Sequence, residues 1–334
     1  LLRLAEKFQI PVCCSIMGLG GFPASHPLFI GNIGMHGSFQ TGMAVDNSDL
    51  ILTAGARFSD RVAGDRKKFG EGAVIIQLDI DPAEINKNVY VQHSVVGDLK
   101  ESLEKIAEEG CPMEHEKWLQ EISGWKNVGV VKEQKDSYPH PLKVIQAVQR
   151  CLNQDDIIAT DVGQHQMWTA QTYRFEKSRT FLTSGGLGTM GFGLGAAIGA
   201  QVAHPERRVV LISGDGSFHM NLNELTTLAS YELPVVVIVM NNSVLGMVRQ
   251  WQKLFYGGRF SQTDPHRKTD FVKLAEAFGV TGMRITRPEE VDDVVQRALE
   301  LKKPVVVDCQ ISPDENVLPM IPPGASVDRI ITEM

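Results

Sequence analysis

Runs of valine and isoleucine dominate the second half of the chain. Three of them, at 209–213, 235–240 and 305–310, are nearly continuous, which is typical of parallel strands covered by helices on both faces. In the first half, shorter β-rich segments alternate with stretches able to form helices, and these segments are 10–14, 50–54 and 73–78. The alternation predicts the α/β class, with two doubly wound parallel-sheet domains.

The same pattern divides the chain. It fades between residues 108 and 140, where charges and two tryptophans intervene and prolines close the stretch. We therefore expect a central domain at 1–107, a linker at 108–140, a second domain at 141–310 and an irregular C-terminal tail at 311–334. The chain starts without Met, in what reads as the last turns of a helix, so we expect the first domain to be truncated.

Composition narrows the class of protein. A net charge of −7 without basic runs argues against nucleic acid as a partner. The longest apolar run, 235–240, is far shorter than the ~20 residues of a membrane-spanning helix. Five cysteines without a C-x-x-C pair favour a reducing compartment. We expect a cytoplasmic protein if the source is bacterial; an organelle stays open, because a targeting peptide would lie upstream.

The strongest chemical signal follows two of the predicted strands. Gly214-Asp215-Gly216-Ser217 comes directly after one strand, and 24 residues separate Gly216 from Asn241-Asn242 at the end of the next. The carboxyl ends of parallel strands are where α/β sheets bind ligands. The oxygens of Asp215 and Asn242 suit Mg²⁺, which usually completes its shell with phosphates, and a helix starting near Ser217 would face the anion. Either fragment alone is more often a turn or a strand exit.

Together the two fragments resemble the motif of thiamine diphosphate (ThDP)-dependent enzymes, GDG followed after about 25 residues by NN. The resemblance implies ThDP and Mg²⁺ as cofactors and makes the backbone carbonyl of Val244 the third protein ligand of the metal, beside Asp215 and Asn242. The family's other cofactor-binding positions carry over to Gly163, Gln164, His165, Gly188, Met190, Gly214, Gly216, Ser217, Gly246 and Met247.

The glycines around Met190 allow a second interpretation. Gly186, Gly188 and Gly191 form a literal G-x-G-x-x-G, the pattern of nicotinamide-binding loops. That fingerprint needs a strong strand before it and an acidic residue about 20 positions later, and the next strong strand here ends in the Asp215 loop. The resemblance to the ThDP enzymes instead implies that Met190 is the bulky residue that keeps the cofactor bent.

The segment after Asn242 narrows the family. Residues 245–256 read as a helix on which Met247, Val248 and Trp251 share a face. Apolar residues that share one face of a helix more often belong to the hydrophobic core than to an active site. This helix, however, begins beside the predicted metal ligand. Its sequence, and 317–322 near the end, are similar to acetolactate synthases. The resemblance implies that Met247 and Val248 line the substrate site and that Trp251 shapes the pocket for the second 2-keto acid.

The first domain resembles the FAD-binding central domain of the biosynthetic acetolactate synthases, where the flavin has no redox role. Arg57 and Arg61 taken alone could be solvated, and Ser59 stands where relatives often carry Asp. The resemblance places Arg61 at the carboxylate of the second keto acid and beside the flavin. The remaining flavin positions are Met35, His36, Gly37, Gly55, Arg57, Asp79, Ile80 and Asp98.

The resemblance therefore implies an acetolactate synthase catalytic subunit that decarboxylates pyruvate on ThDP. It condenses the product with pyruvate or 2-ketobutyrate, in branched-chain amino-acid biosynthesis. It also implies a homodimer or higher oligomer with the active site at the interface, and a small regulatory subunit as a further partner. The glutamate that activates ThDP lies in an N-terminal domain with no match here, so we expect a partial, poorly active subunit. Another ThDP lyase (glyoxylate carboligase or a 2-keto acid decarboxylase) and a non-catalytic ThDP-binding subunit stay open.

Overall fold

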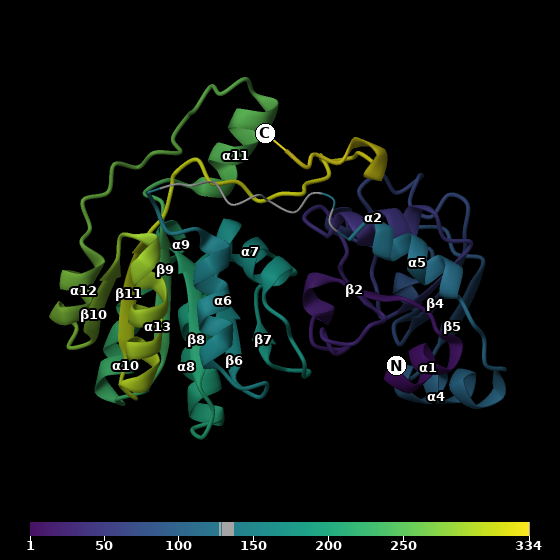
Figure 1. Cartoon of the computed structure of the whole chain (residues 1–334), viewed down its shortest axis with the longest axis horizontal. Helices are drawn as coiled ribbons and strands as arrows, with labels where there is room; N and C mark the ends of the chain where they lie inside the picture. The colour runs from purple at the N-terminus through teal and green to yellow at the C-terminus, as the bar shows by residue number, and fades with distance from the viewer. Residues whose placement is uncertain (127, 129–136, 334) are drawn as a thin grey trace. The chain divides into compact units, whose positions relative to one another are not determined.

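The computed structural model describes residues 1–126, 128 and 137–333. The chain divides into two compact units, Leu1–Lys132 with Leu318–Met334, and Glu133–Val317 (Figure 1). Every strand pair within the described sheets is parallel, as the α/β prediction requires. Within the described part of the chain, none of the helices combines the length and apolar character that a bilayer crossing requires.

The second unit is built on one six-stranded sheet with the strand order β10-β11-β9-β8-β6-β7. Its strands are β6 (Ile157–Thr160), β7 (Phe181–Leu182), β8 (Val209–Gly214), β9 (Val236–Asn241), β10 (Thr281–Ile285) and β11 (Val305–Gln310). The Val/Ile runs form β8, β9 and β11, and every residue of these three strands except the last is buried. The hydrophobic pattern did not predict β7 and β10, which are the two edge strands of this sheet.

Helices cover both faces of this sheet, because its strands are apolar on both sides. In Figure 1, α6 (Pro141–Cys151) and α13 (Val291–Glu300) lie in front of the sheet, and α8 (Phe192–Ala203) and α10 (Leu225–Ser230) lie behind it. One buried apolar cluster joins α8, α10 and α12 (Phe271–Ala277) to the strands. The remaining helices are α7 (Gln164–Thr172), α9 (Asp215–Phe218) and α11 (Gly246–Phe255).

The order of the strands reverses at β6 and β8, the point at which doubly wound α/β sheets form a ligand-binding crevice. From β6 the chain proceeds to β7 on one side, whereas from β8 it proceeds to β9 on the other. At such a switch point the loops after the two strands diverge and leave room for a ligand. The loops that leave β6 and β8 carry Gly163 and Asp215, so the topology places both at this crevice.

The first unit contains two small sheets. One pairs β1 (Val12–Cys14) with β2 (Phe29–Asn32), and the other has the order β3-β4-β5. The strands of the latter are β3 (Leu50–Ala54), β4 (Val74–Asp79) and β5 (His93–Val96). The helices are α1 (Leu2–Phe8), α2 (Phe39–Asp46), α3 (Asp60–Ala63), α4 (Leu99–Glu109) and α5 (Glu116–Gly124).

Two segments differ from the expected boundaries. Part of the stretch expected to be a linker, 108–140, forms α5, which buries Ile122 against Ile30 and Ala44 of the first unit. Trp118 and Trp125 pack edge-to-face, with ring centroids 5.9 Å apart, against this cluster. The expected tail, 311–334, also contributes to packing: Val317 and Met320 are fully buried. Residues 127 and 129–136 of the expected linker lie outside the described residues.

We predict that Gly193→Ala destabilises the second unit. A Cβ on Gly193 would lie 2.6 Å from Leu211 Cδ1 and 2.9 Å from the Asp161 backbone nitrogen, so α8 would have to move off the sheet. Overpacking of this kind costs about 1–3 kcal/mol. Gly199→Ala in the same helix is the control, because nothing lies within 4 Å of its added Cβ. Urea unfolding should show a loss only for Gly193→Ala, and equal stabilities would contradict the packing argument.

Candidate functional site

The register of the sheet brings the two predicted metal-binding loops side by side. Gly214 of β8 pairs with Met240 of β9, so the loops that begin with Asp215 and Asn241 leave the sheet at the same level. The two asparagines then diverge. Asn241 turns away and donates from Nδ2 to Asp308 Oδ1 at 2.8 Å, whereas Asn242 donates to Gln164 Oε1 at 3.3 Å. Only the second asparagine therefore lies toward the crevice.

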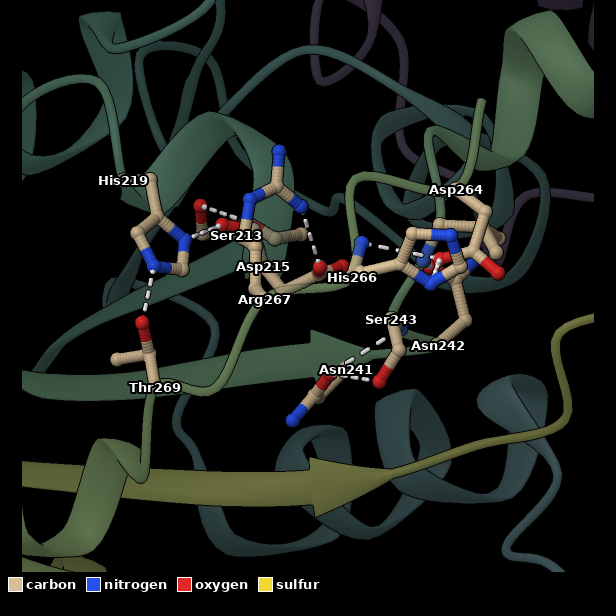
Figure 2. Close-up of polar contacts among 12 residues, drawn as sticks. Ser213, Asp215, His219, Asn241, Asn242, Ser243, Asp264, His266, Arg267 and Thr269 are labelled. Atoms are coloured by element: carbon tan, nitrogen blue, oxygen red, sulfur yellow. Dashed lines mark hydrogen bonds and ion pairs between the residues drawn. The ribbon is translucent and has the colours of Figure 1, made fainter. Parts of the chain in front are cut away.

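Asp215 is a buried carboxylate with a cationic partner. Its side chain is 4% exposed, and Arg267 Nη1 lies 2.9 Å from its Oδ2 (Figure 2). Burial raises the pKa of Asp215 to about 6, although the neighbouring guanidinium of Arg267 acts to lower it. The backbone carbonyl of Asp215 also contacts the ring of His219, at 2.7 Å from Nδ1. A buried carboxylate needs a positively charged partner, and Arg267 supplies it for Asp215.

A chain of buried amides orients Asn242. Gln164, at the start of α7, accepts from Asn242 Nδ2 and donates to Gln250 Oε1 at 3.0 Å. Gln250 in turn holds both backbone groups of Val317, its Nε2 donating to the carbonyl at 3.0 Å and its Oε1 accepting from the amide at 2.9 Å. The Asn242 Oδ1 accepts from the Val244 amide at 3.1 Å. The orientation of the Asn242 amide is therefore fixed from both ends.

Small residues make room for these contacts. A Cβ on Gly246 would lie 2.0 Å from Gln164 Oε1 and 2.6 Å from Asn242 Nδ2, so no larger residue fits. A Cβ on Gly214 would lie 2.8 Å from the Nδ1 of His165. These glycines let α11, α7 and the β8 loop approach one another around the predicted ligands.

Asp161 is a second buried carboxylate at the crevice, and the sequence analysis assigned it no role. Its Oδ1 accepts from the amides of Gly191 at 2.8 Å and Val162 at 3.0 Å. Burial raises its pKa, and these hydrogen bonds oppose the rise. Asp161 therefore ties the loop before α8 to the end of β6. His165 beside it is buried too, and burial lowers its pKa to about 3, so this imidazole is neutral.

Comparison with known proteins assigns the family. Residues 161–309 match the model for the C-terminal TPP-binding domain of thiamine pyrophosphate enzymes, and residues 1–106 match the model for their central domain. The chain belongs to the thiamine pyrophosphate enzymes. The second unit, with the loops of Asp215 and Asn242, is thus the part that corresponds to the thiamine diphosphate-binding domain of this family.

Within the thiamine pyrophosphate enzymes, the chain is similar over 99% of its length to proteins named acetolactate synthase large subunits. It is 45% identical to a probable large subunit of Methanocaldococcus jannaschii and 42% identical to that of Haemophilus influenzae. It is 41% identical to the isozyme 3 large subunit of Escherichia coli. The chain spans 58–59% of the length of these three relatives.

In this thiamine pyrophosphate enzyme the predicted residues of the second unit gather around the β6, β8 and β9 ends. Gly163, Gln164 and His165 begin α7, and Met190 lies near the predicted metal-binding loop, since its Cε lies 3.8 Å from a Cβ built on Gly216. Gly188 has a left-handed backbone with φ of 65°. The Ser217 hydroxyl donates to the Val162 carbonyl at 2.6 Å, and the Val244 side chain is buried.

The residues predicted to line the substrate pocket share α11. Val248 is half exposed, and Trp251 packs edge-on against Phe255 with ring centroids 5.6 Å apart. Met247 belongs to the same helix, one residue after Gly246. The first turns of α11 therefore carry these side chains beside the predicted metal-binding loop that contains Asn242.

Four of the predicted flavin positions of the first unit lie at the carboxyl ends of the β3-β4-β5 strands. Gly55 follows β3, Asp79 ends β4 and Ile80 follows it, and Asp98 comes after β5, so all four lie at the carboxyl ends of three adjacent parallel strands. Asp98 caps α4 through hydrogen bonds from the amides of Lys100 and Glu101, and Ile80 is 70% exposed.

The other flavin positions follow β2 and β3: Met35, His36, Gly37 and Arg57 lie on loops, and Arg61 lies in α3. The Met35 amide donates to the Arg61 carbonyl at 2.7 Å, and Gly37 has no room for a side chain against the Asn32 carbonyl. Burial, followed by the charge of Arg61, lowers the pKa of His36 to about 4. The Arg57 carbonyl accepts from Asn88, and the Arg61 side chain is 63% exposed with Asp60 3.5 Å away.

Sequence reasoning missed Arg267 and Gln250. Arg267 lies in a stretch, 261–270, that has no helix or strand and no apolar periodicity, so nothing in the pattern pointed to the metal loop. Gln250 lies inside the segment that carried the resemblance, yet a glutamine on a helix reads as a surface residue. Its burial at 2% exposure became visible only in the structure.

We predict that Gln250→Leu lowers the free energy of unfolding by about 1–3 kcal/mol, because it leaves buried polar groups of Gln164 and Val317 without a partner. Gln252→Leu is a matched control. Gln252 makes the same pair of bonds to the backbone of Ser261, at 3.1 and 2.9 Å, but at an exposed site. Thermal unfolding should show a larger loss of stability for Gln250→Leu than for Gln252→Leu. Equal losses of stability would show that the buried hydrogen bonds of Gln250 contribute no more than the exposed ones of Gln252.

Proposed function

We propose that this chain is the catalytic part of an acetolactate synthase, which joins two 2-keto acid units with loss of CO₂. The observation that carries the proposal is the placement of Asp215 and Asn242 at neighbouring strand ends beside Met190, in a chain 41–45% identical to acetolactate synthase large subunits over 99% of its length. The substrates we propose are pyruvate, and either pyruvate or 2-ketobutyrate as the acceptor.

The residues of the β8 and β9 loops fit Mg²⁺. A carboxylate, an amide oxygen and a backbone carbonyl are the hard oxygen donors that this ion prefers, and it fills the rest of its shell with phosphate and water. Asp215 and Asn242 with the Val244 carbonyl would hold it. Among the described residues no group of three or more His, Cys, Asp or Glu side chains gathers as a softer metal would require.

ThDP supplies the electron sink for the carbanion left by decarboxylation, and the protein supplies binding and orientation. Gly163, Gln164 and His165 at the start of α7, with Gly214, Gly216 and Ser217, would border the diphosphate. Met190 and Gly188 would lie against the ring system. Met247, Val248 and Trp251 would bound the acceptor pocket. For Arg61, in the first unit, we propose that its planar fork binds a keto-acid carboxylate.

For the first unit we propose FAD as a non-redox cofactor. The support is the convergence of Gly55, Asp79, Ile80 and Asp98 at the carboxyl edge of β3, β4 and β5, where α/β sheets receive nucleotides. Homo-oligomerisation and a small regulatory subunit are further proposals, supported by the large-subunit names of the relatives.

Asp215→Asn tests the diphosphate site. Without the carboxylate the metal loses its charged ligand, so we expect Mg²⁺-dependent binding of ThDP to weaken at least about tenfold. Calorimetric titration of ThDP with and without Mg²⁺ measures it. Asp155→Asn removes the same charge from an exposed carboxylate, which pairs with Lys177 at 2.7 Å before β6. If Asp215→Asn binds as tightly as Asp155→Asn, the site is elsewhere.

Trp251→Leu tests the acceptor pocket. A flat indole discriminates one methylene by roughly 1–3 kcal/mol, so we expect the preference for 2-ketobutyrate over pyruvate to change by about tenfold. An active preparation is given both acceptors, and acetolactate and acetohydroxybutyrate are separated by chromatography. Formation of free aldehyde, or of tartronate semialdehyde from glyoxylate, by the unmodified protein would favour a decarboxylase or glyoxylate carboligase instead.

A further inference from the structure

A charged residue interrupts the valine run of β11. Asp308 lies among buried residues of this strand, and its side chain is 3% exposed. A carboxylate in such a place is costly unless a positive charge and hydrogen-bond donors surround it. Its Oδ2 lies 3.1 Å from Arg284 Nε, and its Oδ1 accepts from Asn241 Nδ2 at 2.8 Å. Asp308 therefore joins β10 to the end of β9, where the predicted metal-binding loop begins.

Strand register places these three side chains on one face of the sheet. Arg284 of β10 pairs with Asp308 of β11, which in turn pairs with Val239 of β9. Asn241 comes two residues after Val239, so it lies on the same face of β9, diagonal to Asp308. The Ile311 amide donates to the Asn241 carbonyl at 2.9 Å, so β9 and β11 stay paired up to this point. The contact between Asp308 and Asn241 is thus fixed by the sheet.

Asn241 uses the oxygen of the same amide to shape the loop. Its Oδ1 accepts from the Ser243 amide at 3.2 Å and from the Ser243 hydroxyl at 3.3 Å (Figure 2). Ser243 has a left-handed backbone with φ of 61°, a conformation that is uncommon for a residue with a Cβ. Asn242 precedes Ser243 and Val244 follows it. The turn held by Asn241 therefore determines where these two neighbours point.

The carboxylate of Asp308 determines which way the Asn241 amide faces. An ionised carboxylate only accepts hydrogen bonds, whereas a primary amide has a donating nitrogen and an accepting oxygen. Opposite Asp308, Asn241 must present its nitrogen, and its oxygen then faces the Ser243 amide. The reversed amide would place oxygen against oxygen at Asp308 and donor against donor at Ser243. Arg284 occupies the second carboxylate oxygen and supplies the counter-charge.

We propose that Asp308 is a positioning residue for the predicted metal-binding loop: by orienting the Asn241 amide, it maintains the turn that directs the two ligands supplied by this loop. Those ligands are the Asn242 side chain and the Val244 carbonyl, so the inference rests on the proposed function. Both oxygens of Asp308 are engaged within the protein, so Asp308 acts through Asn241 and is not itself a ligand.

A calorimetric titration of the full chain with Mg²⁺ at saturating ThDP tests this role. In Asp308→Asn, the new amide nitrogen must face either Arg284 or the nitrogen of Asn241, so one pair of donors conflicts or Asn241 turns over. Loss of a group that orients metal ligands should weaken Mg²⁺ binding about tenfold. Asp270→Asn is the matched control, because Asp270 pairs with the same guanidinium and Asn also caps α12. It should change the affinity by less than about twofold, because this ion pair is partly exposed.

The exchanged pair separates the orientation of the amide from the charge. In the double variant Asn241→Asp with Asp308→Asn, the amide at position 308 donates to the carboxylate at 241, and its oxygen accepts from Arg284. The second carboxylate oxygen at 241 accepts from the Ser243 amide. All three contacts return, so the Mg²⁺ affinity should recover to within about threefold of wild type. Asn241→Asp alone places two carboxylates face to face and should bind more weakly. A double variant as weak as Asp308→Asn would overturn the proposal.

Amide hydrogen exchange gives a readout that does not need the metal. Turning the Asn241 amide over removes the acceptor of the Ser243 amide. Exchange should therefore rise in residues 241–245 of Asp308→Asn, while β6 and β8 keep their protection. A rise spread over β10 and β11, without a selective change at Ser243, would show that Asp308 only stabilises the sheet and would overturn the positioning role.

The titration also separates this inference from the proposed function. Equal affinities of Asp308→Asn and Asp270→Asn, with normal Mg²⁺ binding by the wild type, would overturn the role of Asp308 alone. Absence of Mg²⁺-dependent ThDP binding in the wild type would reject the metal site itself, and the role of Asp308 with it.

Discussion

The parallel register of β6, β8 and β9 is the constraint on which the site depends. Gly214 pairs with Met240, so β8 and β9 end at the same level, and Thr160 at the end of β6 pairs with Ile212 close to that level. A shift of one residue in any of these pairs would reverse the faces of an entire strand. Because both faces of these strands pack closely against helices, such a shift would require both faces to repack. The sheet core therefore fixes the relative positions of the loops before any ligand is present.

Close approach is the second requirement, and glycines provide it. Gly193 lets α8 lie against β6 and β8, and Gly246 lets the start of α11 meet Gln164 and Asn242. Around these contacts the polar groups are buried, and each therefore needs a partner of its own. Asp161 and Gln250 fill that need for the loops on either side. The same side chains that complete the fold thus hold the functional loops.

Much of this arrangement could be predicted from the sequence. The Val/Ile runs gave β8, β9 and β11, and the Gly-Asp-Gly and Asn-Asn fragments gave the two loops, because strand composition and strand-end chemistry are local properties. The edge strands β7 and β10 were missed, since β7 has two residues and β10 is only partly buried. Arg267 could not be predicted, because its contact with Asp215 joins positions 52 residues apart through an irregular segment.

The hold of Gln250 on Val317 has a consequence for how this region tolerates change. Gln250 recognises the amide and the carbonyl of residue 317, and Gln164 recognises the carbonyl of Glu315 at 2.8 Å. Main-chain atoms are the same in every amino acid except proline. Residues 315 and 316 can therefore change in identity while their path stays fixed, whereas the buried side chain of Val317 must stay apolar. An insertion or a deletion in this stretch would displace Gln250 and Gln164, and with them the contact of Gln164 with Asn242. In related proteins we therefore expect the length of this segment to be conserved more strictly than the identity of its exposed residues.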